Sequence, residues 1–293
     1  MKEKTIYALG FFDGVHLGHQ ALLCKCRQLA EKHQCNAGVL TFIGHPDTLV
    51  LGQTPKFLTT EKERKALLLQ YNMNTVVELP FTKELMAKPW EDFLQELLLQ
   101  GAAGFVCGYD FRFGYKGEGT AQKLEAYCQS HGLPCAIVAP QIIEGVRISS
   151  TYIRQLLEDG QVETANAFLG HPHTLTGTVV TGRGLGHTMG IPTANILLQP
   201  EMVQPKTGVY ACSVQIDGKP YAAVTNIGSR PTVGGHQTRL ESWVLDFDGD
   251  LYGKELTVRF HSYLRPEKKF ATLEDLQAQI QKDAEKTLKI LEN

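Results

Sequence analysis

The chain has 293 residues, a length that favours two domains, and its 43% hydrophobic and 20% charged residues are typical of a globular protein with buried cores. The formal net charge of −2 gives no basic field, so we expect neither nucleic acid nor a membrane as a partner. No signal peptide fits the charged N-terminus, and no apolar run reaches the ~18 residues of a membrane span. A cytoplasmic protein with seven reduced cysteines is therefore expected.

From residue 5 to about 140, strand-like apolar runs alternate with helical patterns. The expected strands are Ile6–Leu9, Ala37–Ile43, Thr75–Leu79, Phe105–Gly108 and Cys135–Ala139, and the expected helices are Gly18–Lys32, Thr60–Tyr71, Trp90–Gln100 and Thr120–His131. Thr60 and Glu63 have the spacing of a capping box. This alternation predicts an α/β fold with a doubly wound, Rossmann-like parallel sheet, in which ligands bind at the carboxyl ends of the strands.

A glycine-rich turn, Gly10–Gln20, joins the first expected strand to the first expected helix. The helix start offers unpaired N–H groups and the positive end of the helix dipole, which suit a phosphate. His16 and His19 are three residues apart, so they share one face of the first helical turn. They lack the further ligands of a metal site. On spacing alone, a merely tight turn is an equal alternative, and the two histidines favour the phosphate site.

The segment Gly108–Gly114 follows the fourth expected strand and is rich in aromatic, charged and glycine residues. In isolation a surface loop is the better interpretation. In this position the aromatic side chains can form a wall for a flat ring, with Asp110 and Arg112 as polar anchors.

A second polar segment, Arg147–Arg154, opens a helix. Its hydroxyl groups can simply cap that helix. They can also bind a phosphate together with the guanidinium groups of Arg147 and Arg154.

The pattern changes after Gly170, where we place the boundary between two domains, 1–169 and 170–293. Short alternating runs lie at Thr176–Thr181, Val209–Ile216, Tyr221–Ile227, Arg239–Asp246 and Leu256–Leu264, with hairpin turns expected at Asp217-Gly218 and Asp248-Gly249. This pattern predicts a small antiparallel β-barrel. A C-terminal helix should follow, with Thr272 as its cap and Leu273, Leu276, Ile280 and Leu288 on its apolar side.

The segment Gly177–Asn195 contains five glycines and ends in Pro192-Thr193-Ala194-Asn195. Thr193 and Asn195 alternate along an extended chain, so both face one way, and their oxygens suit Mg²⁺. A glycine-rich hairpin loop is the simpler interpretation. Glu241 lies in another alternating run, where a carboxylate is more often solvated than catalytic.

Several of these segments resemble one family. Gly10–Gln20 is similar to the His-x-Gly-His signature of nucleotidylyltransferases, in the variant of the prokaryotic bifunctional riboflavin kinase/FAD synthetases. Four further segments resemble motifs of that family: Ile148–Arg154, Gly190–Asn195, Asn226–Thr232 and Leu264–Phe270. The resemblance covers about residues 8–283. It implies an FMN adenylyltransferase in residues 1–169, which makes FAD and pyrophosphate from FMN and ATP, and a riboflavin kinase in residues 170–293.

The resemblance also implies roles for residues. The catalytic residues would be His16, His19 and Arg154 for adenylyl transfer and Glu241 as the general base of the kinase. ATP would contact Phe12, Asp13, Gly14, Ser149, Ser150 and Thr151 in the first domain, and Gly182, Gly186, Thr193 and Asn195 in the second. Flavin would contact Asp110, Phe111 and Arg112 in the first domain, and Asn226 and Arg265 in the second. Mg²⁺ would arrive with ATP and bind Thr193 and Asn195, and no tightly bound prosthetic group is implied.

Three positions depart from the family pattern. His187 stands where arginine is usual, Trp243 where histidine is common, and Gly44 where proline is common. The first two leave open an FAD synthetase with a weak or inactive kinase barrel. A flavin-binding or nucleotide-binding regulator without chemistry is a second alternative. A cytidylyltransferase or pantetheine-type adenylyltransferase is a third, although it would share only the first motif. The sequence leaves the oligomeric state open.

Overall fold

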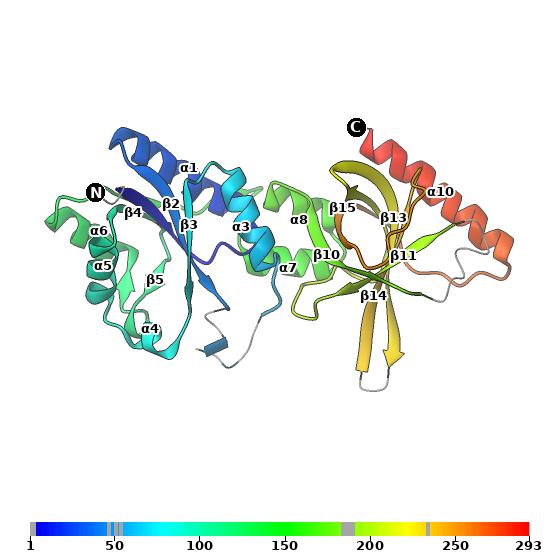
Figure 1. Ribbon diagram of the computed structural model, residues 1–293, viewed down its shortest axis with the longest axis horizontal. Helices are drawn as coiled ribbons and strands as arrows, with labels where there is room; N and C mark the ends of the chain where they lie inside the picture. The colour runs from blue at the N-terminus through cyan, green and yellow to red at the C-terminus, as the bar shows by residue number, and fades with distance from the viewer. Residues whose placement is uncertain are drawn as a thin grey trace. The chain divides into compact units, whose positions relative to one another are not determined.

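The computed structural model describes residues 4–45, 48–49, 52, 55–182, 191–232 and 235–292. The chain forms two compact units, Met1–Ser150 and Thr151–Asn293 (Figure 1). All seven cysteines are free thiols.

The first unit is built on a five-stranded parallel sheet in the order β3-β2-β1-β4-β7. Its strands are β1 (Thr5–Leu9), β2 (Asn36–Ile43), β3 (Thr75–Pro80), β4 (Ala102–Gly108) and β7 (Cys135–Val138). The chain runs outward from β1 to β3 and then crosses to β4 on the other side of β1. Strand order therefore reverses between β1 and β4, and the carboxyl ends of these strands define the expected ligand edge. The predicted doubly wound sheet is confirmed.

Helices cover both faces of this sheet. They are α1 (Leu17–Lys32), α3 (Glu61–Gln70), α4 (Lys83–Ala87), α5 (Trp90–Leu99) and α6 (Ala121–Ser130), with the 3₁₀ turns η1 (Asp13–Val15) and η2 (Tyr115–Gly117). Leu23 of α1 and Leu68 of α3 join one core cluster, while Leu94 of α5 and Leu124 of α6 join another. Two small antiparallel pairs were not expected: β5 (Arg112–Phe113) with β6 (Gly119–Thr120), and β8 (Ile142–Ile143) with β9 (Val146–Arg147).

The predicted capping box begins α3. The Thr60 hydroxyl accepts from the Glu63 N–H at 3.1 Å, and the Glu63 carboxylate accepts from the Thr60 N–H at 2.8 Å. These two bonds satisfy N–H groups that a helix start would otherwise leave without a partner.

The second unit contains a closed barrel in the order β10-β11-β14-β13-β12-β15. Its strands are β10 (His173–Val180), β11 (Thr193–Leu198), β12 (Gly208–Ile216), β13 (Lys219–Thr232), β14 (Gly235–Val244) and β15 (Glu255–Arg265). Helix α10 (Leu273–Leu291), red in Figure 1, lies along the outside of the barrel. The predicted barrel and C-terminal helix are confirmed.

Two further helices precede the barrel, α7 (Ser150–Glu158) and α8 (Val162–Leu169). The Asn166 side chain of α8 donates to the Phe260 carbonyl and accepts from the His173 N–H, both at 2.8 Å. Thus α8 packs on β10 and β15 within the second compact unit, although the change of sequence pattern comes only after it.

Of the two hairpin turns expected in the barrel, one is confirmed and the other is wrong. Asp217-Gly218 does form the expected tight turn, with φ of 49° and 82°. Asp248-Gly249 does not join a hairpin, because β14 pairs with β11 and β13 whereas β15 pairs with β10 and β12. The strand β11 is an additional member of the barrel, and it closes the gap between β10 and β14.

The apolar side of α10 also differs from the expectation. Leu273 is 63% exposed and Leu288 is 39% exposed. The buried positions of the helix are Asp283, Ala284 and Thr287. Two polar residues are thus buried where the hydrophobic pattern predicts none, and Asp283 has its partner on a strand, at Arg265 of β15.

Candidate active sites

The turn after β1 brings the two histidines together. His16 is 6% exposed and caps α1, because its Nδ1 accepts a hydrogen bond of 3.2 Å from the His19 N–H. The two imidazole rings stack, with centroids 3.6 Å apart and planes 11° apart. The two histidines therefore share one face at the start of α1, as predicted, and both rings lie at the positive end of the helix dipole.

The cap fixes which nitrogen of His16 carries the proton. A backbone N–H can only donate, so Nδ1 of His16 must be the acceptor and the proton of the neutral ring sits on Nε2. Burial lowers the pKa of His19 well below its ordinary value, and the neighbouring His16 and Arg64 lower it further. His19 is thus neutral at physiological pH, and its buried Nδ1 has no hydrogen-bond partner among the described residues.

The predicted ATP-binding residues Phe12, Asp13 and Gly14 lie in this turn, but two of their side chains point inward. Phe12 is fully buried in the core with a φ of 61°. The Asp13 carboxylate is buried and accepts from the backbone N–H groups of Leu58 and Thr59, at 3.0 and 3.2 Å. Gly14 has a φ of 76°, a conformation that favours glycine. These residues therefore shape the turn, and only their backbone can face a nucleotide.

Ser150 is joined to this turn, because its hydroxyl donates to the Asp13 carbonyl at 3.1 Å. Ser150 begins α7. Ser149 precedes it in the same unit, while Thr151, which is exposed, and Arg154 belong to the second unit. Ser150 and Arg154 are one helical turn apart and so lie on the same face of α7.

Sequence reasoning missed Arg64, which occupies a position of α3 that the pattern treats as ordinary. Arg64 is 2% exposed, donates to the Phe42 carbonyl at 2.8 Å and lies 4.5 Å from the centre of the Phe11 ring. Burial lowers its pKa, while Asp13, Glu61 and Glu78 oppose that shift. It places a buried positive charge beside the histidine turn. An arginine directly after the capping-box glutamate Glu63 carries no sequence signal of burial.

The predicted flavin loop forms an aromatic cluster in the first unit. Phe111 stacks on Phe113, with ring centres 5.4 Å apart. Asp110 forms an ion pair with Arg147, whose guanidinium lies 5.0 Å from the Tyr109 ring. Arg112 is exposed and donates to the Gly117 carbonyl at 3.3 Å. Arg147, one of the two arginines that could bind a phosphate, is here the partner of Asp110.

The barrel aligns its predicted site residues by strand register. Asn195 of β11 is paired with Glu241 of β14, and Glu241 is paired with Asn226 of β13. A second row, Thr193–Trp243–Val224, lies two residues along the same strands. Because side chains two apart share a face, both rows lie on one wall of the barrel.

Two cavities border these strands. The first, about 350 Å³, lies between the barrel and α10 and is lined by Glu241, Asn226, Arg265 and Asp283 among others. The second, about 330 Å³, is bordered by the segment from Phe247 to Tyr252. Thr193 lines both cavities. A cavity of this size accommodates a small organic ligand.

The donor set at Thr193 and Asn195 fits a hard cation. Both side chains offer neutral oxygen atoms, which Mg²⁺ accepts when phosphates and water supply the remaining ligands. Gly182 lies against Asn195, because a Cβ at residue 182 would be 2.2 Å from the Asn195 amide nitrogen. Gly186 and His187 lie outside the described residues.

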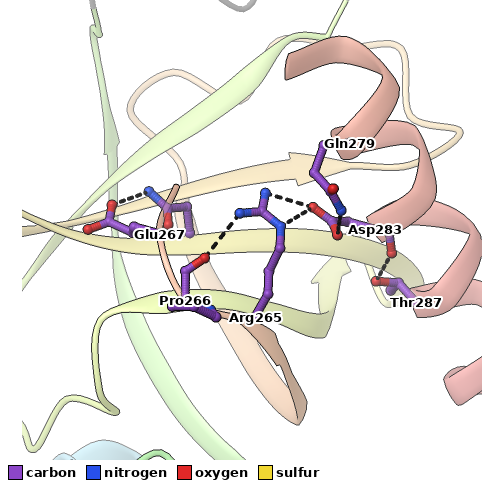
Figure 2. Close-up of polar contacts among 7 residues, drawn as sticks. Arg265, Pro266, Glu267, Gln279, Asp283 and Thr287 are labelled. Atoms are coloured by element: carbon purple, nitrogen blue, oxygen red, sulfur yellow. Dashed lines mark hydrogen bonds and ion pairs between the residues drawn. The ribbon is translucent and has the colours of Figure 1, made fainter. Parts of the chain in front are cut away.

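The flavin residues predicted for the barrel are both tied to neighbours. Asn226 donates to the Glu267 carboxylate at 3.1 Å, and its own Oδ1 is buried without a hydrogen bond to a described residue. Arg265 forms an ion pair with Asp283 of α10 (Figure 2). Sequence reasoning missed Asp283, since a carboxylate on a helix is ordinarily solvated.

The first unit thus has paired histidines at a helix start, and the barrel has a carboxylate between two carboxamides. The family model described as FAD synthetase matches residues 1–152, and the one described as Riboflavin kinase matches residues 169–291. The chain belongs to the family of bifunctional riboflavin kinase/FMN adenylyltransferases.

Relatives match over nearly the whole chain. The bifunctional riboflavin kinase/FMN adenylyltransferase of Listeria monocytogenes is 34% identical over 288 residues, 97% of this chain and 91% of its own. That of Escherichia coli K12 is 36% identical over 286 residues, 96% and 91% of the two chains. A crystal structure named as a macrolide-efflux protein from Streptococcus pneumoniae is 31% identical, with a TM-score of 0.91 over 98% of this chain and 94% of that one. Within the described part of this chain, every helix is too short or too polar to cross a bilayer.

Proposed function

We propose that this chain makes flavin cofactors in two ATP-dependent steps, phosphorylation of riboflavin to FMN in the barrel and adenylylation of FMN to FAD in the first unit. The observation that carries the proposal is the paired-histidine turn of the first unit and the polar row of the barrel, each within the range of its own family model. Because both family models match, an adenylyltransferase with an inactive barrel is not favoured. A pantetheine-type enzyme would not account for the barrel.

In adenylyl transfer, an FMN phosphate oxygen attacks the α-phosphorus of ATP, and pyrophosphate leaves as the bond to the β-phosphate breaks. The attacking group is already anionic at neutral pH, so the site needs no strong base. It must instead stabilise the charge on the α- and β-phosphates. His16 would donate from Nε2, the position that its cap fixes, and His19 would act as a neutral imidazole beside it. Arg154 would add positive charge.

Backbone groups of Phe12, Asp13 and Gly14 would face the nucleotide, since the Phe12 ring and the Asp13 carboxylate are already buried. The hydroxyl residues Ser149, Ser150 and Thr151 would contact phosphate. Asp110, Phe111 and Arg112 would hold FMN, with the Phe111 ring as the flat surface.

In the kinase step, the 5′-hydroxyl of riboflavin attacks the γ-phosphorus of ATP, and ADP leaves. Glu241 would accept the hydroxyl proton, because it lies in the first cavity between Asn195 and Asn226. Riboflavin would occupy this cavity under α10, where Asn226 offers an unpaired acceptor and Arg265 offers donors. ATP would occupy the second cavity, with Gly182 and Gly186 near its phosphates.

Kinases and adenylyltransferases use ATP and a divalent metal. For this chain we propose Mg²⁺, held by the Thr193 hydroxyl and the Asn195 carboxamide oxygen. When bound, it would neutralise charge on the nucleotide phosphates. Thr193 is suited to this position because it lines both cavities.

We propose 1–169 as the limits of the adenylyltransferase and 170–293 as those of the kinase. The family matches end at residue 152 and begin at residue 169, so α7 and α8 fall largely between them. The bond from Asn166 to the barrel means that α8 supports the kinase structurally.

One product assay tests the proposal. The full chain is incubated with riboflavin, ATP and Mg²⁺, and the flavins are separated. Appearance of FMN followed by FAD supports both activities. Formation of FAD from supplied FMN without FMN formation from riboflavin would limit the chain to adenylyl transfer. His187 and Trp243, which depart from the family pattern, would then be the first residues to test as the cause. Tight binding of flavin or nucleotide without any product would identify a regulator.

A further inference from the structure

A buried polar network joins α10 to the end of β15. Asp283 is 2% exposed, and its carboxylate accepts two N–H hydrogen bonds and forms an ion pair. Arg265 donates from Nε at 2.9 Å, its Nη2 lies in ion-pair contact at 2.8 Å, and Gln279 donates from Nε2 at 3.0 Å. Figure 2 shows these groups converging between the helix and the strand.

Docking of the helix does not account for this network. Removing two charges from water costs several kcal/mol per ion, and apolar residues of similar volume often stabilise a fold as well or better. Beside Asp283, Ala284 already packs with Val209, Val224 and Leu245 in an apolar cluster. The ion pair therefore calls for a reason other than attachment of α10.

Both members of the pair line the cavity under α10. A guanidinium has five N–H donors. Asp283 accepts the Nε–H bond and pairs with Nη2, and the Pro266 carbonyl accepts an Nη1–H bond at 3.2 Å, which leaves two N–H donors, one on each Nη, uncommitted among the described contacts. The guanidinium also lies 5.8 Å from the centre of the Phe270 ring. An arginine side chain is otherwise flexible, and this set of contacts holds it in one orientation.

We infer that Asp283 is a positioning residue of the riboflavin pocket, which holds the Arg265 guanidinium so that its two remaining N–H donors meet the carbonyl-bearing edge of the flavin ring. This inference rests on the proposed kinase function and on Arg265 as its flavin contact. Gln279 completes the arrangement by occupying the other carboxylate oxygen, so that Oδ2 is left to the arginine. Helix α10 thus contributes to substrate recognition through a residue that itself need not touch the substrate.

The test is Asp283→Asn in the full chain, with kcat and KM measured separately for riboflavin and ATP. We expect the KM for riboflavin to rise about tenfold, as for loss of one well-oriented hydrogen bond to a charged group. The kcat at saturating riboflavin, the KM for ATP and the FMN adenylylation rate should stay within about twofold. Glu285→Gln, an exposed carboxylate-to-amide change on the same helix, is the matched control and should change none of these.

A double-mutant cycle with Arg265→Met decides whether Asp283 acts through the arginine. We expect the double variant to bind riboflavin no more weakly than Arg265→Met alone. An unchanged KM in Asp283→Asn, or additive effects in the double variant, would overturn the inference. So would a lower unfolding temperature accompanied by loss of kcat and of affinity for both substrates, because that pattern indicates a structural role only.

Riboflavin dissociation constants, from quenching of its fluorescence, separate this inference from the proposed function. A wild-type chain that binds riboflavin without phosphorylating it would refute the kinase, and the dissociation constants of the variants would still decide the role of Asp283. A wild-type chain that binds no riboflavin would refute both.

Discussion

In the first unit two histidines come from a single turn and stack on each other, whereas in the barrel the polar row takes Asn195, Asn226 and Glu241 from three different strands. The first arrangement depends on a helix cap and one glycine-rich turn. The second depends on correct register along two strand interfaces, because a slip of one residue would turn each side chain to the other face. The first site can thus be recognised in a short segment of sequence, and the second only once the barrel is known.

If the two sites are as separate as this comparison implies, single substitutions should remove one activity and spare the other. The largest effect should come from Glu241→Gln, which keeps the shape of the side chain but removes the base. We expect FMN formation from riboflavin to fall by about 10³-fold, because general base catalysis is typically worth 10²–10⁴-fold. FAD formation from supplied FMN should continue at the wild-type rate, and a loss of both activities would contradict the assignment of Glu241 to the barrel reaction alone.

His19→Ala is the reciprocal change. Loss of the neutral ring beside His16 should lower FAD formation from FMN by about 10²- to 10³-fold, in the range seen when one preorganised transition-state contact is removed. FMN formation from riboflavin is the internal control and should be unchanged. Equal damage to both reactions would show that the sites are not independent.

Two substitutions of His16 separate its roles as cap and as donor. His16→Asn keeps a side-chain oxygen that can accept from the His19 N–H, so stability should be retained while FAD formation falls. His16→Ala removes the cap as well and should cost about 1 kcal/mol of stability, measured by urea unfolding. If His16→Asn forms FAD at the wild-type rate, the ring is only a cap.

His173 of the barrel resembles His19 in being a buried histidine with a lowered pKa. It differs from His19 because it lies in the core and has no proposed role in catalysis. Burial chiefly, and the neighbouring His171 in addition, lower its pKa to about 3 against the opposing effect of a backbone hydrogen bond to Val203. Because the folded pKa lies below the unfolded value of about 6.5, stability is complete above pH 6.5 and is lost as pH falls toward 3.

The wild-type chain should therefore lose about 2 kcal/mol between pH 6.5 and 5 through this group. His173→Gln should show a shallower decline over that range, measured by denaturant unfolding of the second unit. At pH 8 the histidine is neutral in both states, so the pH slopes of the two proteins should agree. Parallel declines below pH 6.5 would show that another group is responsible.

Most of the fold could be predicted from the sequence because its signals are local. The five parallel strands, the capping box at Thr60 and the turn at Asp217-Gly218 each depend on a few adjacent residues. The order of strands in the barrel does not depend on a few adjacent residues. Asp248-Gly249 has the composition of a hairpin turn, yet closure of the barrel separates β14 from β15 and leaves a loop between them.

The site residues also differ in whether they could be predicted from adjacent residues of the sequence. His16 and His19 could be paired from spacing alone, while Glu241 gained a role only by family resemblance, since an alternating strand does not reveal what lies opposite. Arg64 and Asp283 could not be found at all. Both are charged residues on helices, and each is buried because of contacts from distant parts of the chain.

Both compact units belong to one polypeptide, so every molecule synthesised brings one site of each kind. A cell that uses this chain for both steps makes the two catalysts in fixed one-to-one proportion, whatever the level of gene expression. The balance between its mononucleotide and dinucleotide flavins must then be set by the turnover and saturation of the two pockets.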